Sequence, residues 1–141
     1  MTNRKKHGGL NLLSLWKKLA RLPFGGRLFS WFLGRMAPYS GTIKARIECF
    51  SAGHAVVSMP DRKKNRNHLH SLHAIALINL GEIATGLAVL SRVDGRGRGI
   101  VTGLRMEYLK KARGKITATA AVDLNVETGE HIIEGELVNE A

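Results

Sequence analysis

Residues 72–91 form the longest mostly apolar run of the chain and predict a helix that is buried on most sides. The run contains no Lys, Arg or Asp, and its one acid is Glu82. A helix of this length spans about 30 Å, and a helix on the protein surface would carry a polar face that this run lacks. Ser71 directly precedes the run and is the predicted N-cap.

The polar residues of this helix share one side. Asn79, Glu82 and Thr85 follow one another at steps of three, and residues three or four apart are neighbours on a helix surface. A carboxylate among apolar side chains is costly unless a charged or hydrogen-bonding group meets it. Glu82 is therefore either an acid with a function or a structural acid that bonds Asn67, a histidine or a backbone group.

Alternation of apolar and polar residues predicts strands before and after the helix. A half-buried strand has a period of two, and this period occurs in residues 43–49, 54–59, 100–109, 116–125 and 131–138. Short connections imply a mostly antiparallel sheet, and wrapping it around the apolar helix covers the apolar surfaces of both. The predicted fold is α+β, with an antiparallel sheet of about five strands around one long central helix, which is the hotdog fold.

Residues 1–36 are predicted to form a basic tail and two amphipathic helices, and residues 37–141 the hotdog domain. The two helices cover residues 10–22 and 27–36, separated by the PFGG sequence of residues 23–26. A basic amphipathic helix with Trp and Phe can lie on a membrane surface, pack against the protein or a partner subunit, or cover a ligand channel. We favour packing, since packing is what stabilises most amphipathic helices.

The net charge of +11 is unevenly distributed. Residues 1–36 hold eight Lys or Arg and no acid, whereas residues 123–141 hold six acids and no Lys or Arg. An excess of positive charge is typical of proteins that bind nucleic acid, anionic lipid or a polyanionic cofactor. It also fits solubility and attraction between oppositely charged ends, so charge alone does not choose among these explanations.

The sequence indicates a cytoplasmic protein. Cys49, the only cysteine, excludes a disulfide within the chain and fits a reducing compartment. It lies on the inward side of the first predicted strand, so we expect a small core residue. Lys17, Lys18 and Arg21 interrupt the first apolar stretch, and no small-residue cleavage site follows, so no signal peptide is predicted. No apolar run is long enough and free enough of charge to predict a membrane span.

Three residues at fixed spacings carry a resemblance to a known family. Asn67 precedes His73 by six residues and Glu82 follows His73 by nine, within the segment NHLHSLHAIALINLGE. This segment resembles the active-site segment of hotdog acyl-CoA thioesterases of the PaaI-like type, in which Asn, a His-Gly-Gly that opens the helix, and a carboxylate have these spacings. The resemblance covers roughly residues 37–138 and is closest to a bacterial branch with an N-terminal helical extension.

The resemblance implies hydrolysis of an acyl-CoA thioester to free acid and CoA. In such a site the backbone N–H of Ala74 holds the thioester carbonyl, because the amino end of a helix favours developing negative charge. Glu82 attacks the carbonyl or activates water, across a subunit interface. Asn67 orients the water or the substrate, His73 opens the helix, and Thr102 on the following strand assists.

This chain departs from the family pattern in two ways that bear on substrate size and rate. The two glycines of the family are Ala74 and Ile75 here. Ala74 still provides its N–H, but Ile75 crowds a place where glycine leaves room for close approach. Glu82 also replaces an Asp, which lengthens the acidic arm by one carbon.

The resemblance further implies a homodimer or dimer of dimers, with no cofactor other than the coenzyme A of the substrate. The nucleotide phosphates of coenzyme A need cations. The candidates are Arg62, Lys63, Arg66 and Lys111. They lie in basic loops, which are otherwise explained as solvated surface loops. No metal site is predicted, because no Cys or acid at ligand spacing accompanies His68, His70 and His73.

Two other functions stay open from the sequence. The first is a non-catalytic protein that binds or senses acyl-CoA or lipid with the same pocket. The second is a basic module that contacts the membrane surface through residues 10–36. Such a module can also bind nucleic acid, which is the partner that we expect least. Trp16, Phe29 and Trp31 either line a tunnel for a long acyl chain or belong to the core.

Overall fold

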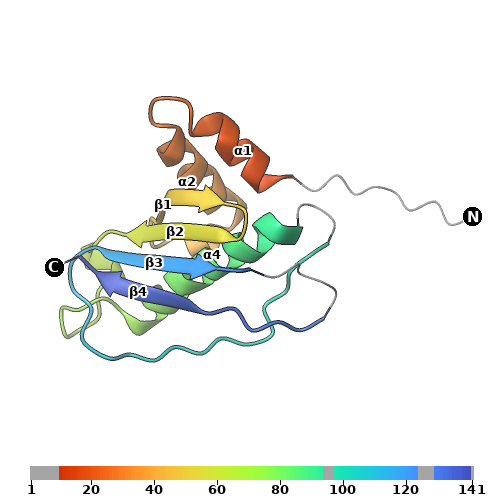
Figure 1. The fold of residues 1–141 in the computed structure, drawn as a ribbon. Coiled ribbons are helices and arrows are strands. Elements are labelled where there is room, and N and C mark those ends of the chain that lie inside the picture. Colours follow the sequence, from red (N-terminus) through yellow and green to blue (C-terminus); the bar gives the residue numbers. More distant parts are fainter. Residues whose placement is uncertain (1–9, 94–96, 124–128, 141) are drawn as a thin grey trace, which may run out of the picture.

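The computed structural model describes residues 10–93, 97–123 and 129–140. Three helices come first, namely α1 (Leu12–Leu19), α2 (Gly25–Met36) and the short α3 (Pro38–Gly41). The rest of the fold consists of β1 (Arg46–Ser51), β2 (His54–Met59), the 3-10 helix η1 (Lys63–Asn65), the long helix α4 (Ala74–Val93), β3 (Ile116–Ala121) and β4 (Gly135–Asn139) (Figure 1). The predicted tail, residues 1–9, and the predicted strand end at residues 124–125 lie outside the described residues.

The four strands form one antiparallel sheet in the order β1-β2-β3-β4, and α4 packs across it. Helix α4 contacts all four strands, β2 and β3 above all. Leu80, Ala84 and Ala88 face the sheet and are at most 1% exposed. This arrangement is the predicted hotdog fold, with four strands among the described residues where about five were expected. Contrary to the expectation from the sequence, α4 is long and apolar enough to cross a membrane by length and composition alone. Its packing against the sheet accounts for that composition.

The predicted strand at residues 100–109 is wrong, because these residues pair with no strand in the described part of the chain. The segment instead runs beside α4, where Met106 lies against Gly81 and the Tyr108 hydroxyl donates a 2.9 Å hydrogen bond to the carbonyl of Ala74. A strand needs a neighbour to accept and donate its backbone hydrogen bonds, and alternation in the sequence records only the side-chain pattern. We call residues 97–109 the edge segment; they lie beyond β4 (Figure 1).

The expectation that Cys49 is a core residue is also wrong. The pairing of β1 with β2 shifts register between Ile47 and Cys49. A shift by one residue turns the following side chains to the other face of the sheet. Cys49 is therefore exposed, and Phe50 is buried in its place. In β3 and just after it, where no such shift occurs, the predicted inward residues are buried: Ile116, Ala118, Ala120 and Val122.

Phe29 attaches the N-terminal helices to the body of the protein. Its ring is fully buried and lies 5.2 Å from the ring of Trp16 and 6.1 Å from that of Phe50, between centroids. Helices α1 and α2 thus pack against β1, as favoured from the sequence. Of the three aromatic residues left open between tunnel and core, Trp16 and Phe29 contribute to the core, whereas Trp31 is 62% exposed.

The prediction of Ser71 as the N-cap of the long helix is wrong, because α4 begins at Ala74. His73 occupies the position before the helix. The backbone N–H and the hydroxyl of Ser71 instead donate to the side-chain oxygen of Asn67, both at 3.2 Å. Ser71 therefore shapes the loop before the helix rather than its first turn.

Candidate functional site

The backbone N–H of Ala74, the first of α4, has no acceptor among the described residues. Nδ1 of His73 accepts a hydrogen bond from the N–H of Ile75 at 3.1 Å, and the carbonyl of His73 accepts one from Leu77 at 3.1 Å. The N–H of Ala74 donates to no residue in the described parts of the chain, and Ala74 is exposed. An unpaired N–H at the positive end of the helix dipole is suited to hold a developing negative charge.

Asn67 closes the loop that leads into α4. Its side-chain oxygen accepts hydrogen bonds from the N–H of Leu69 at 2.9 Å and from Ser71, and its own N–H donates to the Ser71 carbonyl at 2.8 Å. The structure therefore gives Asn67 the turn role that Asn often has. Within the described residues, the Nδ2 group of Asn67 has no acceptor, so it is the part of the side chain that can meet a ligand.

Asn65 holds the start of α4 in place and was not singled out from the sequence. It is 4% exposed, and its Nδ2 donates to the carbonyls of Ile43 at 3.0 Å and Pro60 at 3.2 Å. Its own carbonyl accepts the N–H of His73 at 2.8 Å. The sequence signal was weak, because an Asn within a basic loop is most simply explained as a solvated residue.

Glu82 lies on α4 and lines a cavity of about 590 Å³ between α2, α3, the residues leading into β1, and α4. The side chain is half-buried, and this burial raises the pKa of its carboxyl group. In residues 10–93, 97–123 and 129–140, no side chain bonds or pairs with that carboxyl group. The explanation of Glu82 as a structural acid bonded to Asn67 or a histidine therefore has no contact to support it.

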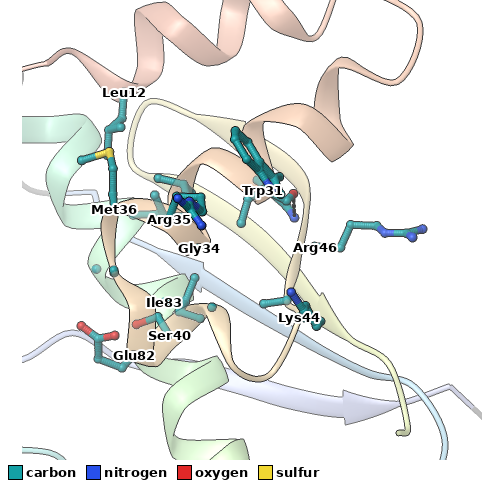
Figure 2. Close-up of a pocket in the computed structure, with 18 of the residues that line it drawn as sticks. Leu12, Trp31, Gly34, Arg35, Met36, Ser40, Lys44, Arg46, Glu82 and Ile83 are labelled. Atoms are coloured by element: carbon teal, nitrogen blue, oxygen red, sulfur yellow. Dashed lines mark hydrogen bonds between the residues drawn. The ribbon is translucent and has the colours of Figure 1, made fainter.

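The walls of this cavity are mainly apolar, and cations surround its rim. Figure 2 shows Glu82 on one side of the cavity and Lys44 and Arg46 on the other. Lys44 has a backbone φ of 54°, which is rare for a residue with a long side chain. The apolar lining includes Leu33, Met36, Ile83, Leu87 and Leu90, and the lining cations are Arg27, Arg35, Lys44 and Arg46. These cations were not singled out from the sequence, because two lie on α2 and two at or just before the start of β1, and only the packing of α2 brings them to one cavity.

One chain does not bring the predicted catalytic residues together. Ala74 and Glu82 are eight residues apart on the same helix, which corresponds to about 12 Å along its axis. Thr102 is exposed and donates to Glu130 at 2.9 Å. No described contact joins Thr102 to Asn67, Ala74 or Glu82.

Two basic loops meet at the amino end of α4. The N–H of Leu72 donates to the carbonyl of Ala112 at 2.8 Å, and the N–H of Gly114 donates to Asp61 at 2.8 Å. These bonds bring the loop of Arg62, Lys63 and Arg66 beside the loop of Lys111. Lys63 and Lys111 are exposed.

Arg66 already has a partner in this chain. Its Nε lies 2.6 Å from the Asp61 carboxylate, and this contact lowers the pKa of Asp61. Nη1 of Arg62 is buried and has no hydrogen-bond partner among the described residues. Among the described residues, Arg66 is thus the one of the four cations predicted to bind coenzyme A that forms an ion pair.

The histidines considered as metal ligands do not form a cluster. His68 and His70 are exposed, and His73 uses Nδ1 to cap α4. Among the residues that the structure describes, no group of three or more His, Cys, Asp or Glu side chains could hold a metal ion.

A family model matches most of this architecture. The model described as domain of unknown function (DUF4442) covers residues 25–138, from the start of α2 to the end of the sheet. The chain belongs to the DUF4442 family. The DUF4442 match includes α2, the residues that line the cavity apart from Leu12, and the segment from Asn67 to Glu82. No curated protein matches the chain in sequence.

Solved structures similar to this DUF4442 chain include proteins named as thioesterases. PA5026 from Pseudomonas aeruginosa, a protein of unknown function described as a probable thioesterase, is 26% identical, with a TM-score of 0.70 over 84% of this chain and 86% of PA5026. The Staphylococcus aureus thioesterase SAV0944 is 26% identical, with a TM-score of 0.61 over 73% of this chain and 86% of SAV0944.

The phenylacetic acid degradation protein PaaI from Thermus thermophilus shares the fold at 22% identity. Its TM-score is 0.62 over 73% of this chain and 87% of PaaI. The resemblance to PaaI-like hotdog proteins that the sequence carries is thus confirmed at the level of the fold.

Proposed function

We propose that this protein is an acyl-CoA thioesterase that acts as a homodimer, with Glu82 of one subunit and the N–H of Ala74 of the partner subunit facing one thioester carbonyl. One observation carries the proposal: α4 has an N–H at its amino end and a half-buried carboxyl group in an apolar cavity, and neither group has a partner among the described residues. The first suits the carbonyl oxygen as it gains negative charge. The second suits a nucleophile or general base.

The separation of Ala74 and Glu82 is the reason for proposing two subunits. About 12 Å along one helix is too far for both groups to act on one carbonyl, so the other group has to come from a second copy. We place that copy on the edge segment, where Ile100 is 85% and Leu109 91% exposed. Two edge segments paired with each other would complete the strand that the sequence alternation predicts, because an unpaired strand edge recruits a partner.

The proposed reaction adds water across the carbon–sulfur bond. The carboxylate of Glu82 either removes a proton from water, whose oxygen attacks the carbonyl carbon, or attacks the carbon itself and is later released by water. The carbonyl oxygen meanwhile gains charge next to the N–H of Ala74. The carbon–sulfur bond then breaks, sulfur keeps the electron pair, and the CoA thiolate takes up a proton. Neither a metal nor a redox cofactor takes part.

The two ends of an acyl-CoA have separate places in this proposal. The acyl chain enters the cavity beside Glu82, where Leu33, Ile83 and Leu87 line the wall. The nucleotide phosphates lie against the basic loops at the amino end of α4 of the partner subunit. Arg62 is the foremost candidate there, because its buried Nη1 has no partner in the described structure. The names given to PA5026 and SAV0944 favour a thioesterase over other activities of this fold.

A specific feature also supports a second candidate function, an acyl-CoA-binding protein without turnover. Ile75 is 50% exposed directly beside the open N–H of Ala74. A branched side chain at this place restricts how closely a thioester approaches the amide. Binding without hydrolysis is therefore the alternative that an experiment has to separate from catalysis.

The test is a turnover screen with short, long and aromatic acyl-CoAs, measured as thiol release, for the wild type and Glu82→Gln. We expect kcat to fall about a hundredfold or more in Glu82→Gln, the range for loss of a general base, while calorimetry still detects acyl-CoA binding. Glu134→Gln, a change at an exposed acid on the chain leading to β4, is the matched control and should keep full activity. Wild-type binding without thiol release from any substrate would favour the non-catalytic function instead.

A further inference from the structure

We propose that the outer face of α2 docks the protein on the surface of an anionic lipid bilayer. Leu28, Trp31 and Arg35 follow one another at steps of three and four residues, so they form one stripe along the helix. Phe24 directly precedes the helix, and its ring lies beside Arg27 of the first turn. Phe24 is 75%, Leu28 49% and Trp31 62% exposed. The opposite side of α2 packs against the rest of the protein, where Phe29 is fully buried. Helix α2 is therefore apolar on both faces, and only the inner face has a protein partner in the described structure.

Cations accompany this apolar stripe. The guanidinium of Arg27 lies 5.6 Å from the centroid of the Phe24 ring, and that of Arg35 lies 5.9 Å from the Trp31 ring. Lys17 and Lys18 on α1 are exposed. The first acid in the sequence is Glu48, whereas ten Lys or Arg precede it. In the described residues, none of the cations before residue 48 forms an ion pair.

Aromatic and cationic side chains on one exposed helix face fit the boundary of an anionic membrane. Trp and Phe enter the boundary between headgroups and acyl chains, while Arg and Lys remain at the phosphates. A second copy of this chain fits poorly, because both faces would carry the same charge. A nucleic acid would use the cations but would leave the apolar side chains of Phe24, Leu28 and Trp31 without a role.

The position of this face agrees with such a partner. Trp31, Arg27 and Arg35 also line the cavity that contains Glu82, so the docking face lies at the edge of that cavity. Helix α2 packs on β1, at the opposite edge of the sheet from the edge segment (Figure 1). A dimer formed through the edge segment would leave the docking face free. The docking proposal does not depend on hydrolysis.

The experiment is cosedimentation of the purified full chain with vesicles of phosphatidylcholine alone and of phosphatidylcholine with phosphatidylglycerol. We expect binding to the anionic vesicles only, weakened by added salt because salt screens the cations. The double variant Phe24→Ser/Trp31→Ser should bind about tenfold more weakly or worse, since it loses the two large apolar side chains that enter the bilayer. Ile132→Ser, at a side chain that is 88% exposed on the chain leading to β4, is the matched control and should bind as the wild type does.

Tryptophan fluorescence gives a second measurement on the same samples. Trp31 is exposed, whereas Trp16 contacts Phe29 and Phe50, so a blue shift on anionic vesicles should occur in the wild type and be lost in Trp31→Phe. Circular dichroism checks that each variant is folded. Equal binding of the wild type and the Phe24→Ser/Trp31→Ser variant would overturn the proposal, as would absence of vesicle binding. Binding to heparin as tight as to vesicles, with no effect of the apolar changes, would instead show a nonspecific polyanion surface.

Discussion

Nδ1 of His73 accepts a hydrogen bond from the N–H of Ile75 at 3.1 Å, and this cap leaves the N–H of Ala74 without a partner in the described structure. Because Nδ1 is the acceptor, the proton of a neutral His73 is on Nε2. The cap thus satisfies the second amide of the helix and keeps the first one open. If that open amide holds the thioester oxygen, removing it should damage catalysis but not folding.

Ala74→Pro removes this amide selectively. Ala74 is the first residue of α4, where proline is well tolerated because its missing N–H has no helical acceptor. We expect normal circular dichroism and a fall in kcat of about a hundredfold to a thousandfold, as for loss of one donor to an oxyanion. Ala74→Gly keeps the N–H and is the control, for which activity should stay close to the wild type. Full activity of a folded Ala74→Pro protein would exclude this amide from the mechanism.

Mixing two inactive variants tests whether the site is shared between subunits. After joint refolding, Glu82→Gln and Ala74→Pro chains form mixed dimers in which one site contains both intact groups. With random pairing, about a quarter of the wild-type activity should return, measured as thiol release from the mixture. Each variant refolded alone is the control. If the mixture has no more activity than its components, the two groups belong to one subunit or do not act together.

The acidic limb of the pH profile should reflect the burial of Glu82. Burial raises the pKa of its carboxyl group above the usual 4.5, and both proposed roles require the ionised form. We expect kcat/KM to rise with pH through that raised pKa. Ile83→Ser, which makes the cavity wall more polar, should move the limb to lower pH. If the acidic limb of the pH profile has the same midpoint in Ile83→Ser as in the wild type, a group other than Glu82 causes the pH dependence.

The same pKa shift predicts how stability depends on pH. The folded protein holds the Glu82 proton more tightly than the unfolded chain does, so neutral Glu82 stabilises the fold fully below pH 4.5. This contribution is lost as the pH rises through the folded-state pKa. Glu82→Gln should therefore be more thermally stable than the wild type at neutral pH, and the difference should shrink at low pH. Thermal unfolding across this range measures the effect.

Asp61 should have the opposite pH dependence. The hydrogen bond from Arg66 is the main reason that the pKa of Asp61 lies below its usual 3.8, and the N–H of Gly114 adds to it. This contribution to stability is present above pH 3.8 and is lost as the pH falls through the folded-state pKa. Asp61→Asn should unfold at a slightly lower temperature than the wild type at neutral pH only. A deficit that persists in strong acid would assign the effect to packing.

The sequence predicted the fold wherever side-chain alternation and backbone pairing agree. The strand at residues 54–59 and the inward residues of β3 follow from period-two alternation, because both neighbours of these strands are in the same chain. The register shift that exposes Cys49 places one extra residue of β1 between two pairs with β2. Nothing in the residue types of β1 marks this position, so alternation alone did not predict it. The edge segment has the alternation of a strand. Alternation does not show whether another strand lies beside the segment to form backbone hydrogen bonds with it.

The sequence assigned the candidate residues to a loop and a helix but did not give the arrangement of the cavity around Glu82. The spacing of Asn67, His73 and Glu82 placed the candidates on one loop and one helix, as the structure has them. That Asn67 uses its oxygen to close a turn depends on loop geometry that a spacing does not encode. The cavity beside Glu82 combines side chains from distant segments, so its shape depended on how α2 packs through Phe29.

The cavity can be narrowed from α4 without disturbing the backbone. Gly86 lines it, and a Cβ added there would meet only Oε1 of Glu82, at an ordinary 3.7 Å. Gly86→Leu should therefore fold, with a gain in helix propensity of about 1 kcal/mol, and place its side chain where we locate the acyl chain. We expect kcat/KM for palmitoyl-CoA to fall about tenfold or more, the scale set by loss of apolar burial, and that for acetyl-CoA to change little. Gly86→Ala is the size control, and equal losses for both substrates would place the acyl chain elsewhere.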